Sequence, residues 1–164
     1  MFSAAIITIS DKGSSGRRED LSGPEIKKII ASLPAEVKVY EIVPDNKEII
    51  AHKIIQCVDR IGIDLIITTG GTGVSPRDVT PEATREVIEK EIPGMAEVMR
   101  SESLKKTPHA MISRAIVGIR RTSLIINLPG SPRAVKENLT AILPALPHTL
   151  AKLKGDEAEC ASSD

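Results

Sequence analysis

Short apolar runs rich in β-branched residues alternate along this chain with segments whose apolar residues recur at helical spacing. The runs predict strands at residues 3–10 (SAAIITIS), 37–44 (VKVYEIVP), 64–69 (DLIITT) and 123–129 (SLIINLP). The segments between them predict helices with apolar faces at Ile26, Ile29, Ile30 and Leu33, and at Ile50, Ile54, Cys57, Val58 and Ile61. From Ala134 the pattern is again helical, with Leu139, Ile142, Leu143, Leu146 and Leu150 apolar and with Pro144 and Pro147 expected to bend or break the helix.

A further helix is predicted after the third strand. Thr80 is expected to be its N-cap, with Pro81 at the first helical position and Glu82 in the first turn, and its end is expected near Pro93 and Gly94. The next region is predicted to hold a short helix at 95–104, a loop through Pro108 and His109, and an edge strand at 115–119.

Strands that alternate with helices imply right-handed crossovers and a mostly parallel sheet covered on both faces. The sequence therefore predicts an α/β fold, a three-layer α/β/α sandwich. We expect one domain over residues 1–154 and a polar C-terminal tail over 155–164, and we expect the basic loop at 12–20 to be mobile.

Composition excludes several classes of function. Of the 164 residues, 41% are hydrophobic and 27% charged, as in a soluble globular protein, and 22 Lys and Arg balance 22 Asp and Glu, so no global field favours nucleic acid or an anionic membrane. Phe2 and Tyr40 are the only aromatic residues, which leaves little for base stacking. We find no targeting signal or membrane span, and Cys57 and Cys160 form no disulfide framework, so we expect a cytoplasmic protein.

Turn-forming and polar residues follow each predicted strand. They are Ser10 and Asp11 after the first, Pro44 and Asp45 after the second, Gly70, Gly71, Thr72, Gly73 and Asp78 after the third, and Pro129, Gly130, Ser131 and Pro132 after the last. In an open parallel sheet, ligands bind beyond the carboxyl ends of the strands, so these residues predict a site at one sheet edge. Each loop taken alone is also explained by ordinary turn formation.

The loop after the third strand, TTGGTGVSPRD, matches neither the P-loop nor the G-x-G-x-x-G pattern. Its glycines still allow successive N–H groups to form an anion-binding nest, to which the hydroxyls of Thr69, Thr72 and Ser75 can add donors. Asp45 and Asp78 would repel a phosphate unless a cation lay between them, and Mg²⁺ binds through one or two carboxylates together with nucleotide phosphates. The alternative is that Asp78 caps a turn and Asp45 is a solvated loop acid, and Arg77 is either a surface residue or a phosphate ligand.

Several separate blocks resemble one known family. In order, they are ITISDKGSSGRREDLSGP, VPDN, TTGGTGVSPRDVTPEAT, PGMAEVMR, ISRAIVGIR and TSLIINLPGSP. Together they resemble the MogA/MoaB family and the related G domains of gephyrin and its plant counterpart, which bind molybdopterin and act in molybdenum cofactor synthesis. The resemblance covers roughly residues 4–150.

The resemblance implies a homotrimer of α/β/α subunits. It also implies a molybdopterin adenylyltransferase, which transfers AMP from ATP to the terminal phosphate of molybdopterin with Mg²⁺ and releases pyrophosphate. By motif, Asp45 and Asp78 correspond to the family's two functional aspartates, expected to act in catalysis and to hold the metal, and Ser113 corresponds to a molybdopterin-binding serine. The remaining expected substrate-binding residues are Ser10, Asp11, Thr69, Gly70, Gly71, Thr72, Gly73, Ser75, Arg77, Pro129, Gly130 and Ser131.

Two local features bear on the branch of the family. After GIR the family often has glycine where this chain has Arg121, which affects the expected turn and the ligand edge near it. The form SPRDVTPEAT is closer to MogA and the gephyrin-type G domains than to the MoaB branch. Two alternatives to the enzyme remain: a non-catalytic molybdopterin-binding or scaffold trimer of the MoaB type, and a general nucleotide-binding regulator. A molybdenum-insertion enzyme is the expected pathway partner of the adenylyltransferase.

Overall fold

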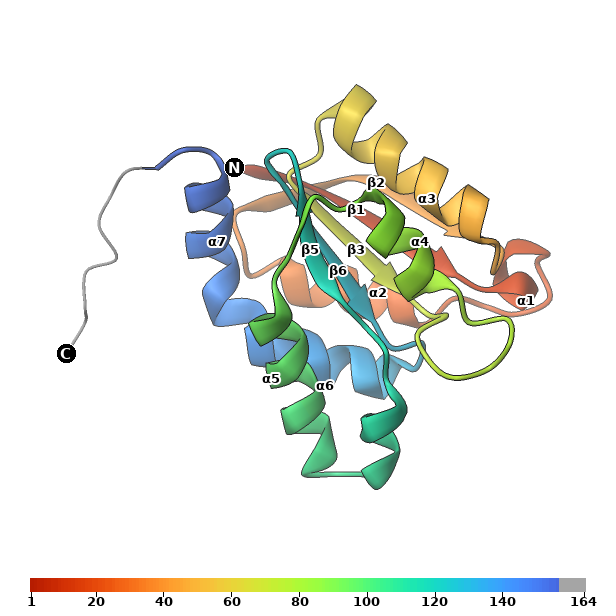
Figure 1. The fold of residues 1–164 in the computed structure, drawn as a ribbon. Helices are drawn as coiled ribbons and strands as arrows, with labels where there is room; N and C mark the ends of the chain where they lie inside the picture. Colours follow the sequence, from red (N-terminus) through yellow and green to blue (C-terminus); the bar gives the residue numbers. More distant parts are fainter. Residues whose placement is uncertain (157–164) are drawn as a thin grey trace.

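The computed structural model describes residues 1–156 and shows a central sheet between two layers of helices (Figure 1). The elements along the chain are β1 (Phe2–Ile9), α1 (Asp11–Ser14), α2 (Ser22–Ile30), β2 (Ala35–Val43), α3 (Lys47–Ile55), a π-helix (Gln56–Ile61), β3 (Leu65–Thr69), α4 (Thr80–Val87), β4 (Lys90–Glu91), α5 (Pro93–Leu104), a 3₁₀ helix (Pro108–Ile112), β5 (Val117–Arg120), β6 (Ser123–Leu128), α6 (Pro132–Ile142), a 3₁₀ helix (Leu143–Ala145) and α7 (Leu146–Leu153). The four predicted main strands are confirmed to within two residues at each end. Residues 157–164 of the expected tail, including Cys160, lie outside the described residues.

The sheet is mostly parallel, as predicted. Its strand order is β2-β1-β3-β6-β5-β4, in which the first four strands run parallel, β5 pairs antiparallel with β6, and β4 pairs antiparallel with β5. The prediction of β5 as an edge strand is wrong, because the two-residue strand β4 pairs with its outer side. The carboxyl ends of β2, β1, β3 and β6 therefore lie along one edge of the sheet. The loops with the predicted site residues follow these ends.

Each central strand is buried on both faces, which explains its continuous apolar run. In β1, Ala4 and Ile6 pack in the core that contains α2, α5, α6 and α7, whereas Ala5 and Ile7 pack in the core that contains α3 and α4. Figure 1 shows these two groups of helices on opposite faces of the sheet. The three-layer α/β/α prediction is confirmed.

The prediction for the helix after β3 is wrong at both ends. Thr80 is the first residue of α4 and not its N-cap; its hydroxyl donates to the Gly70 carbonyl and its N–H to the Gly71 carbonyl. The helix ends at Val87, and Pro93 begins the next helix, α5. Thr80 thus fixes the loop in front of the helix, because its hydroxyl and its N–H both donate to carbonyls of that loop, and this N–H is one of those that a helix start leaves without an intrahelical partner.

The other expectations for helices are largely confirmed. The helix expected at 95–104 is α5, Pro144 lies in the short 3₁₀ break, and Pro147 lies in the first turn of α7. The expected loop through Pro108 and His109 is a 3₁₀ helix, and the basic loop at 12–20 begins with the one-turn helix α1. The π-helix at Gln56–Ile61 was not predicted.

Arg121 lies in the tight turn between β5 and β6, where its φ of 52° is in the left-handed region that favours glycine. This explains why glycine is expected at the position. The turn precedes β6, at the end of the sheet opposite to the carboxyl ends of the parallel strands. The expectation that Arg121 borders a ligand edge at those carboxyl ends is therefore wrong.

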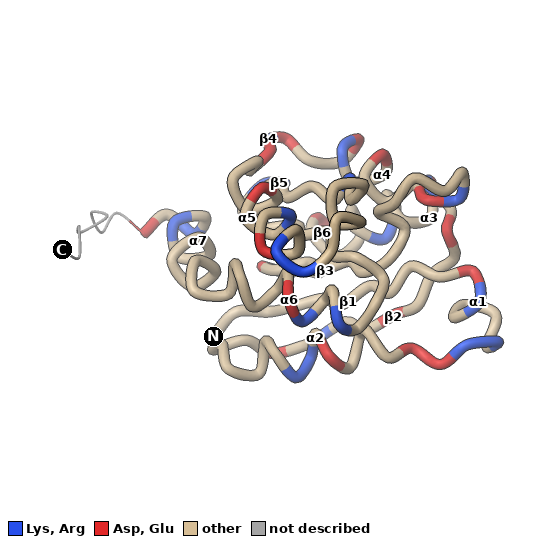
Figure 2. The backbone as a smooth tube through the Cα atoms, turned by 90° about the horizontal axis from the view of Figure 1, so that it is seen from below, with Lys and Arg blue, Asp and Glu red and all other residues tan. Residues whose placement is uncertain are grey.

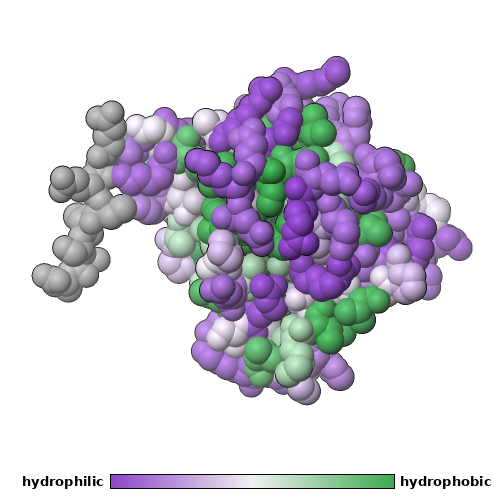
Figure 3. Space-filling model, viewed as in Figure 1, coloured by the Kyte–Doolittle hydropathy of each residue, from purple (hydrophilic) through white to green (hydrophobic). Residues whose placement is uncertain are grey.

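Surface charge agrees with the balanced composition. Basic and acidic positions are interspersed along the described chain (Figure 2), and the face seen in Figure 3 is mostly hydrophilic, with separate apolar areas. Large exposed apolar side chains include Val74, Leu104, Met111 and Ile112. Among the described residues, no helix has the length and apolar character needed to cross a bilayer.

Candidate active site

The loop between β3 and α4 is shaped by its own glycines. Gly70 and Gly71 have φ values of 100° and 66°, and a Cβ on Gly70 would lie 2.3 Å from the Ile9 carbonyl oxygen. A Cβ on Gly71 would lie 2.3 Å from Thr80 Oγ1, and one on Gly73 would lie 2.9 Å from Asp78 Oδ2. The glycines therefore make room for neighbouring atoms of the protein itself, and this brings the loop backbone against Asp45 and Asp78.

Several backbone donors at this loop have no acceptor in the described part of the chain. The N–H groups of Gly71, Thr72 and Gly73 donate to none, and neither do those of Gly130 and Ser131 in front of α6. Ser131 is the N-cap of α6, and its Oγ accepts from the Ala134 N–H at 3.2 Å. A row of free N–H groups beside a helix N-terminus is an anion-binding arrangement, since both present positive dipole ends.

Three acidic and basic side chains connect the loops after β1, β2 and β3. The Asp11 N–H donates to Asp45 Oδ2 at 2.9 Å, and the Asp45 N–H donates to Asp11 Oδ1 at 3.0 Å. Arg77 donates to both carboxylate oxygens of Asp11 at 2.8–3.0 Å. The hydrogen bonds from Arg77 lower the pKa of Asp11. Asp11 is thereby fixed as an anion that orients Asp45.

Asp45 and Asp78 lie beside the glycines of the β3–α4 loop, since a Cβ on Gly71 would lie 3.2 Å from Asp45 Oδ1 and one on Gly73 would lie 2.9 Å from Asp78 Oδ2. Burial raises the pKa of Asp45, and the negative charges of Asp11 and Asp78 raise it further. The Asp78 carboxylate accepts the Ser75 N–H at 3.0 Å, which turns it back toward its own loop. Asp45 is thus a carboxylate whose ionised form is disfavoured by its surroundings, and a nearby cation would relieve this.

Two cavities meet at this edge of the sheet. The Ser113 cavity has a volume of about 430 Å³, and the Asp45 cavity has a volume of about 650 Å³. Four residues border both of them: Gly71, Asp78, Gly130 and Ser131. We refer to these four as the shared wall. The free N–H groups of Gly71, Gly130 and Ser131 therefore lie where ligands in the two cavities would touch.

The predicted site residues are distributed unevenly over the cavities. Besides the shared wall, the Ser113 cavity is lined by Thr72, Gly73, Ser113 and Pro129, and the Asp45 cavity is lined by Ser10, Asp45, Thr69 and Gly70. Asp11, Ser75 and Arg77 line neither cavity. The hydroxyl of Thr69 donates to the Pro129 carbonyl at 2.7 Å, so it holds the loop after β6.

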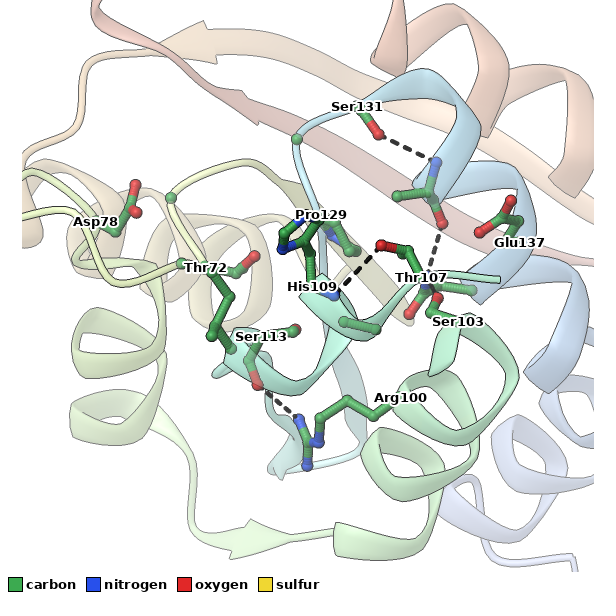
Figure 4. Close-up of a pocket in the computed structure, with 17 residues that line it drawn as sticks. Thr72, Asp78, Arg100, Ser103, Thr107, His109, Ser113, Pro129, Ser131 and Glu137 are labelled. Atoms are coloured by element: carbon green, nitrogen blue, oxygen red, sulfur yellow. Dashed lines mark hydrogen bonds between the residues drawn. The ribbon is translucent and has the colours of Figure 1, made fainter. Parts of the chain in front are cut away.

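Two arginines that the sequence analysis did not single out support the Ser113 region. Arg114 donates to the carbonyls of Gly73 at 2.6 Å and Asp78 at 2.9 Å, and it forms an ion pair with Glu82. Arg100 donates to the Ala115 carbonyl at 2.8 Å. It also donates to the Ser113 carbonyl at 3.5 Å, as Figure 4 shows. Both lay within the blocks ISRAIVGIR and PGMAEVMR, but an arginine that binds backbone carbonyls has no distinctive sequence pattern.

Further lining residues were also missed. In the Ser113 cavity they include Ser103, Thr107, His109, Glu137 and Asn138, and in the Asp45 cavity they include Thr8, Arg18, Asp20 and Ser22. Asp20 accepts hydrogen bonds from Thr8, Tyr40 and the N–H groups of Ser22 and Gly23. Burial alone would raise the pKa of Asp20, but these hydrogen bonds outweigh it and lower the pKa. Asp20 therefore acts as a fixed anion that ties the basic loop to β1 and α2.

Comparison with known proteins gives a consistent match over nearly the whole chain. The family model described as "Probable molybdopterin binding domain" matches residues 5–148. Molybdopterin adenylyltransferase of Helicobacter pylori is 44% identical over 154 residues, which is 92% of this chain and 87% of that protein. Among solved structures, the molybdopterin biosynthesis enzyme MoaB of Thermus thermophilus has a TM-score of 0.90 at 50% identity, covering 94% of this chain and 98% of that one. A structure of MogA has a TM-score of 0.88 at 36% identity, covering 92% and 99%.

Proposed function

This chain belongs to the molybdopterin-binding domain family of molybdenum cofactor biosynthesis, and on that premise we propose that it is a molybdopterin adenylyltransferase. It transfers AMP from ATP to the terminal phosphate of molybdopterin and releases pyrophosphate. The identity of 44% to an adenylyltransferase over most of both chains supports this activity. The structural observation that carries this proposal is the shared wall. The transfer of AMP from ATP to molybdopterin requires the two substrates to bind next to each other.

Each cavity takes one substrate in this proposal. The Ser113 cavity would hold molybdopterin, since by motif Ser113 corresponds to the family's molybdopterin-binding serine, and the Asp45 cavity would hold ATP. A phosphate oxygen of molybdopterin then forms a bond to the α-phosphorus of ATP at the shared wall. The bond from that phosphorus to the α,β-bridging oxygen breaks, and pyrophosphate leaves with the electron pair.

The chain's contribution to this reaction is positioning and charge stabilisation. The free N–H groups of Gly71, Gly130 and Ser131 would bind phosphate oxygens at the shared wall, and the N-terminus of α6 adds its positive dipole end. No side-chain nucleophile is required, because the attacking oxygen belongs to the substrate. Arg114 keeps the backbone of the β3–α4 loop in place for these contacts.

Mg²⁺ fits this site as an ion held jointly with ATP. The described residues contain no cluster of three or more His, Cys, Asp or Glu side chains that could hold a metal by themselves. Mg²⁺ commonly uses one or two carboxylates together with substrate phosphates and waters, and the pair Asp45 and Asp78 meets that requirement. The raised pKa of Asp45 supports this role, because a bound cation would stabilise the ionised carboxylate that its surroundings disfavour. When bound, Mg²⁺ would neutralise the charge of the phosphates.

A product assay tests the proposal. The protein is incubated with molybdopterin, ATP and Mg²⁺, and AMP-linked molybdopterin and pyrophosphate are measured, with a reaction lacking ATP as the control. We expect equal amounts of the two products. Molybdopterin binding without product would instead support a non-catalytic scaffold, which the close structural match to MoaB keeps as the second candidate. ATP binding that is indifferent to molybdopterin would support a general nucleotide-binding regulator.

Assembly and cellular context complete the proposal. We expect a homotrimer, in which the exposed apolar side chains Val74, Met111 and Ile112 offer surface for a neighbouring subunit. The buried free thiol of Cys57 is compatible with the cytoplasm, and a molybdenum-insertion enzyme would take the product. Light scattering measures the assembly directly, and a monomer at micromolar concentration would contradict the trimer.

A further inference from the structure

The two ends of the Ser113 cavity have different chemistry. One end is the shared wall, with its free N–H donors and Asp78. The other end is formed by α5 and α6 and the segment after α5, and it presents Ser103, Thr107, Glu137 and Asn138. In Figure 4, Ser103, Thr107 and Glu137 lie on the side of the cavity away from Asp78. A ligand whose phosphate lies at the shared wall would place its far end among these side chains.

The orientation of the Asn138 amide is fixed. Its Nδ2 donates to Ser103 Oγ at 2.8 Å and to the Ala134 carbonyl at 2.8 Å, so both amide protons are used and Oδ1 faces elsewhere. No described residue donates to Oδ1. Since every fully buried side-chain oxygen and nitrogen of the described residues has a hydrogen-bond partner, Oδ1 is not fully buried. Because Asn138 is only 3% exposed, Oδ1 reaches open space through the cavity that the residue lines.

Glu137, the neighbouring residue, also presents an acceptor. Its Oε1 accepts from Arg133 Nε at 3.0 Å and lies 3.3 Å from Lys106 Nζ, and its side chain is 12% exposed. Burial alone would raise the pKa of Glu137, but the hydrogen bonds from Arg133 and Lys106 outweigh it and lower the pKa. The carboxylate is therefore ionised and accepts only, while Oε2 has no donor among the described residues.

Acceptors at this end suit one type of heterocycle edge. A 2-amino-4-oxo pyrimidine ring, as in a pterin, presents an amino group and a ring N–H side by side, and Glu137 Oε2 and Asn138 Oδ1 are the free acceptors at this end that can take such donors. An edge that carries a carbonyl in place of the amino group would face the carboxylate with a second acceptor. The far end of the Ser113 cavity thus distinguishes the two edges by hydrogen-bond polarity.

We infer that Glu137 recognises the amino and ring N–H edge of the pterin and is the specificity-determining residue of the Ser113 cavity, with Asn138 Oδ1 as a neighbouring acceptor. The inference rests on the proposed function, because it assumes that the Ser113 cavity holds molybdopterin. It goes beyond that function by assigning the choice of heterocycle to one side chain on α6.

A purely structural role for Glu137 makes different predictions. Glu137 also links α6 to the segment after α5 through Arg133 and Lys106. If that link were its only role, Lys106→Gln and Arg133→Gln would have the same effect as Glu137→Gln. If Glu137 recognises the ligand, these two variants keep the acceptor and retain the wild-type preference. Glu102→Gln is a further control, since Glu102 lies on α5, pairs with Lys105 and does not line the Ser113 cavity.

The test is a fluorescence titration with 6-hydroxymethylpterin and with 6-hydroxymethyllumazine, which has an oxo group in place of the amino group. The chain has one tyrosine and no tryptophan, so ligand fluorescence is easily separated. We expect the wild type to prefer the pterin, and Glu137→Gln to bind it about 10- to 100-fold more weakly, the range for losing a hydrogen bond to a charged group. The glutamine amide can donate to the lumazine carbonyl, so the preference should reverse.

The outcomes separate this inference from the proposed function. The titration needs no ATP, so a protein that fails to adenylylate molybdopterin can still pass it. Equal affinity of the wild type for the two probes would overturn the inference, and so would an unchanged ratio in Glu137→Gln or the same reversal in Lys106→Gln and Arg133→Gln. In steady-state assays, Glu137→Gln should raise the KM for molybdopterin and leave the KM for ATP unchanged.

Discussion

The Ser113 cavity and the Asp45 cavity differ in how most of their hydroxyl side chains are used. In the Asp45 cavity, Thr8 and Ser22 donate their protons to Asp20 and to the Gly130 carbonyl, so these hydroxyls hold the walls together. In the Ser113 cavity, Thr107 and Ser113 accept hydrogen bonds from backbone N–H groups, and their own protons have no acceptor among the described residues. The Asp45 cavity presents the carboxylate of Asp45 to its ligand, and the Ser113 cavity presents hydroxyl donors together with the Glu137 carboxylate.

This difference shows how one sheet edge can separate two tasks. Asp45 and Asp78 together make the Asp45 cavity suitable for a metal-bound triphosphate, whereas the free hydroxyl donors and the acceptors of Glu137 and Asn138 in the Ser113 cavity suit a neutral heterocycle. The following predictions test this separation, beginning with the largest expected effect.

Asp45→Asn and Asp78→Asn should each lower kcat by about 100-fold or more, the scale for loss of a preorganised electrostatic contact to a reacting phosphate. Both residues lie in loops at the sheet edge, so the variants should keep the fold, and molybdopterin binding should be affected less than turnover. Turnover is measured with saturating substrates and limiting Mg²⁺. Glu86→Gln, which removes an acid from the exposed pair with Lys47, is the control. Wild-type rates in both variants would show that these acids are ordinary turn residues.

Ser113→Ala should raise the KM for molybdopterin about 10-fold, the scale of one lost hydrogen bond, while the KM for ATP stays unchanged. Steady-state kinetics with each substrate varied in turn measures the split. Ser32→Ala is the matched control, because that hydroxyl donates to the Ile29 carbonyl at the end of α2. An equal rise in both KM values would contradict the division of substrates between the cavities.

Thr69→Val should lower the free energy of unfolding by about 1–2 kcal/mol, because it removes the hydroxyl that donates to the Pro129 carbonyl. Thr69 is only 1% exposed, so water cannot easily replace that donor. Urea denaturation measures the loss. Thr149→Val removes a hydrogen bond to the Ala145 carbonyl that is exposed to solvent, and it should cost less because water replaces the donor. If Thr69→Val kept full stability but bound ATP weakly, the Thr69 hydroxyl would be a ligand donor after all.

The smallest expected effect concerns stability and pH. Because the pKa of Asp45 is raised on folding, its ionisation opposes the folded state, so its cost is absent below the unfolded pKa and grows as pH rises through the folded pKa. Without Mg²⁺, Asp45→Asn should therefore gain melting temperature relative to the wild type at neutral pH, and this gain should shrink toward pH 4. Thermal melts of both proteins across this range test it. A gain that is largest at acidic pH would mean that the folded state lowers the pKa of Asp45.

The fold was predictable because its signals are local. Continuous apolar runs such as the one in β3 follow from burial on both faces, and the rule for carboxyl ends placed Asp45 and Asp78 at one edge before any contact was known. Thr80 was misread because its hydroxyl and N–H donate to carbonyls of the preceding loop, a contact that a capping pattern does not encode.

The missed site residues have a common physical reason. Arg100 and Arg114 donate hydrogen bonds to backbone carbonyls. Because every residue has a backbone carbonyl, no pattern of side chains in the sequence predicts such a contact. Glu137 has a charged partner four residues away on α6, which is the usual pattern of a solvated helix face. Glu137 borders the Ser113 cavity where α5 packs against α6, a tertiary contact that this pattern does not encode.

The shared wall has a consequence for inhibition. A single molecule that reaches across Gly71 and Gly130 into both cavities binds its second half as a tethered group, at an effective concentration that can be in the millimolar range for a short linker. A pterin joined to adenosine through a chain of the right length should therefore bind far more tightly than either fragment alone. The linker is the part to optimise, because one that is too short to span the wall loses the whole advantage.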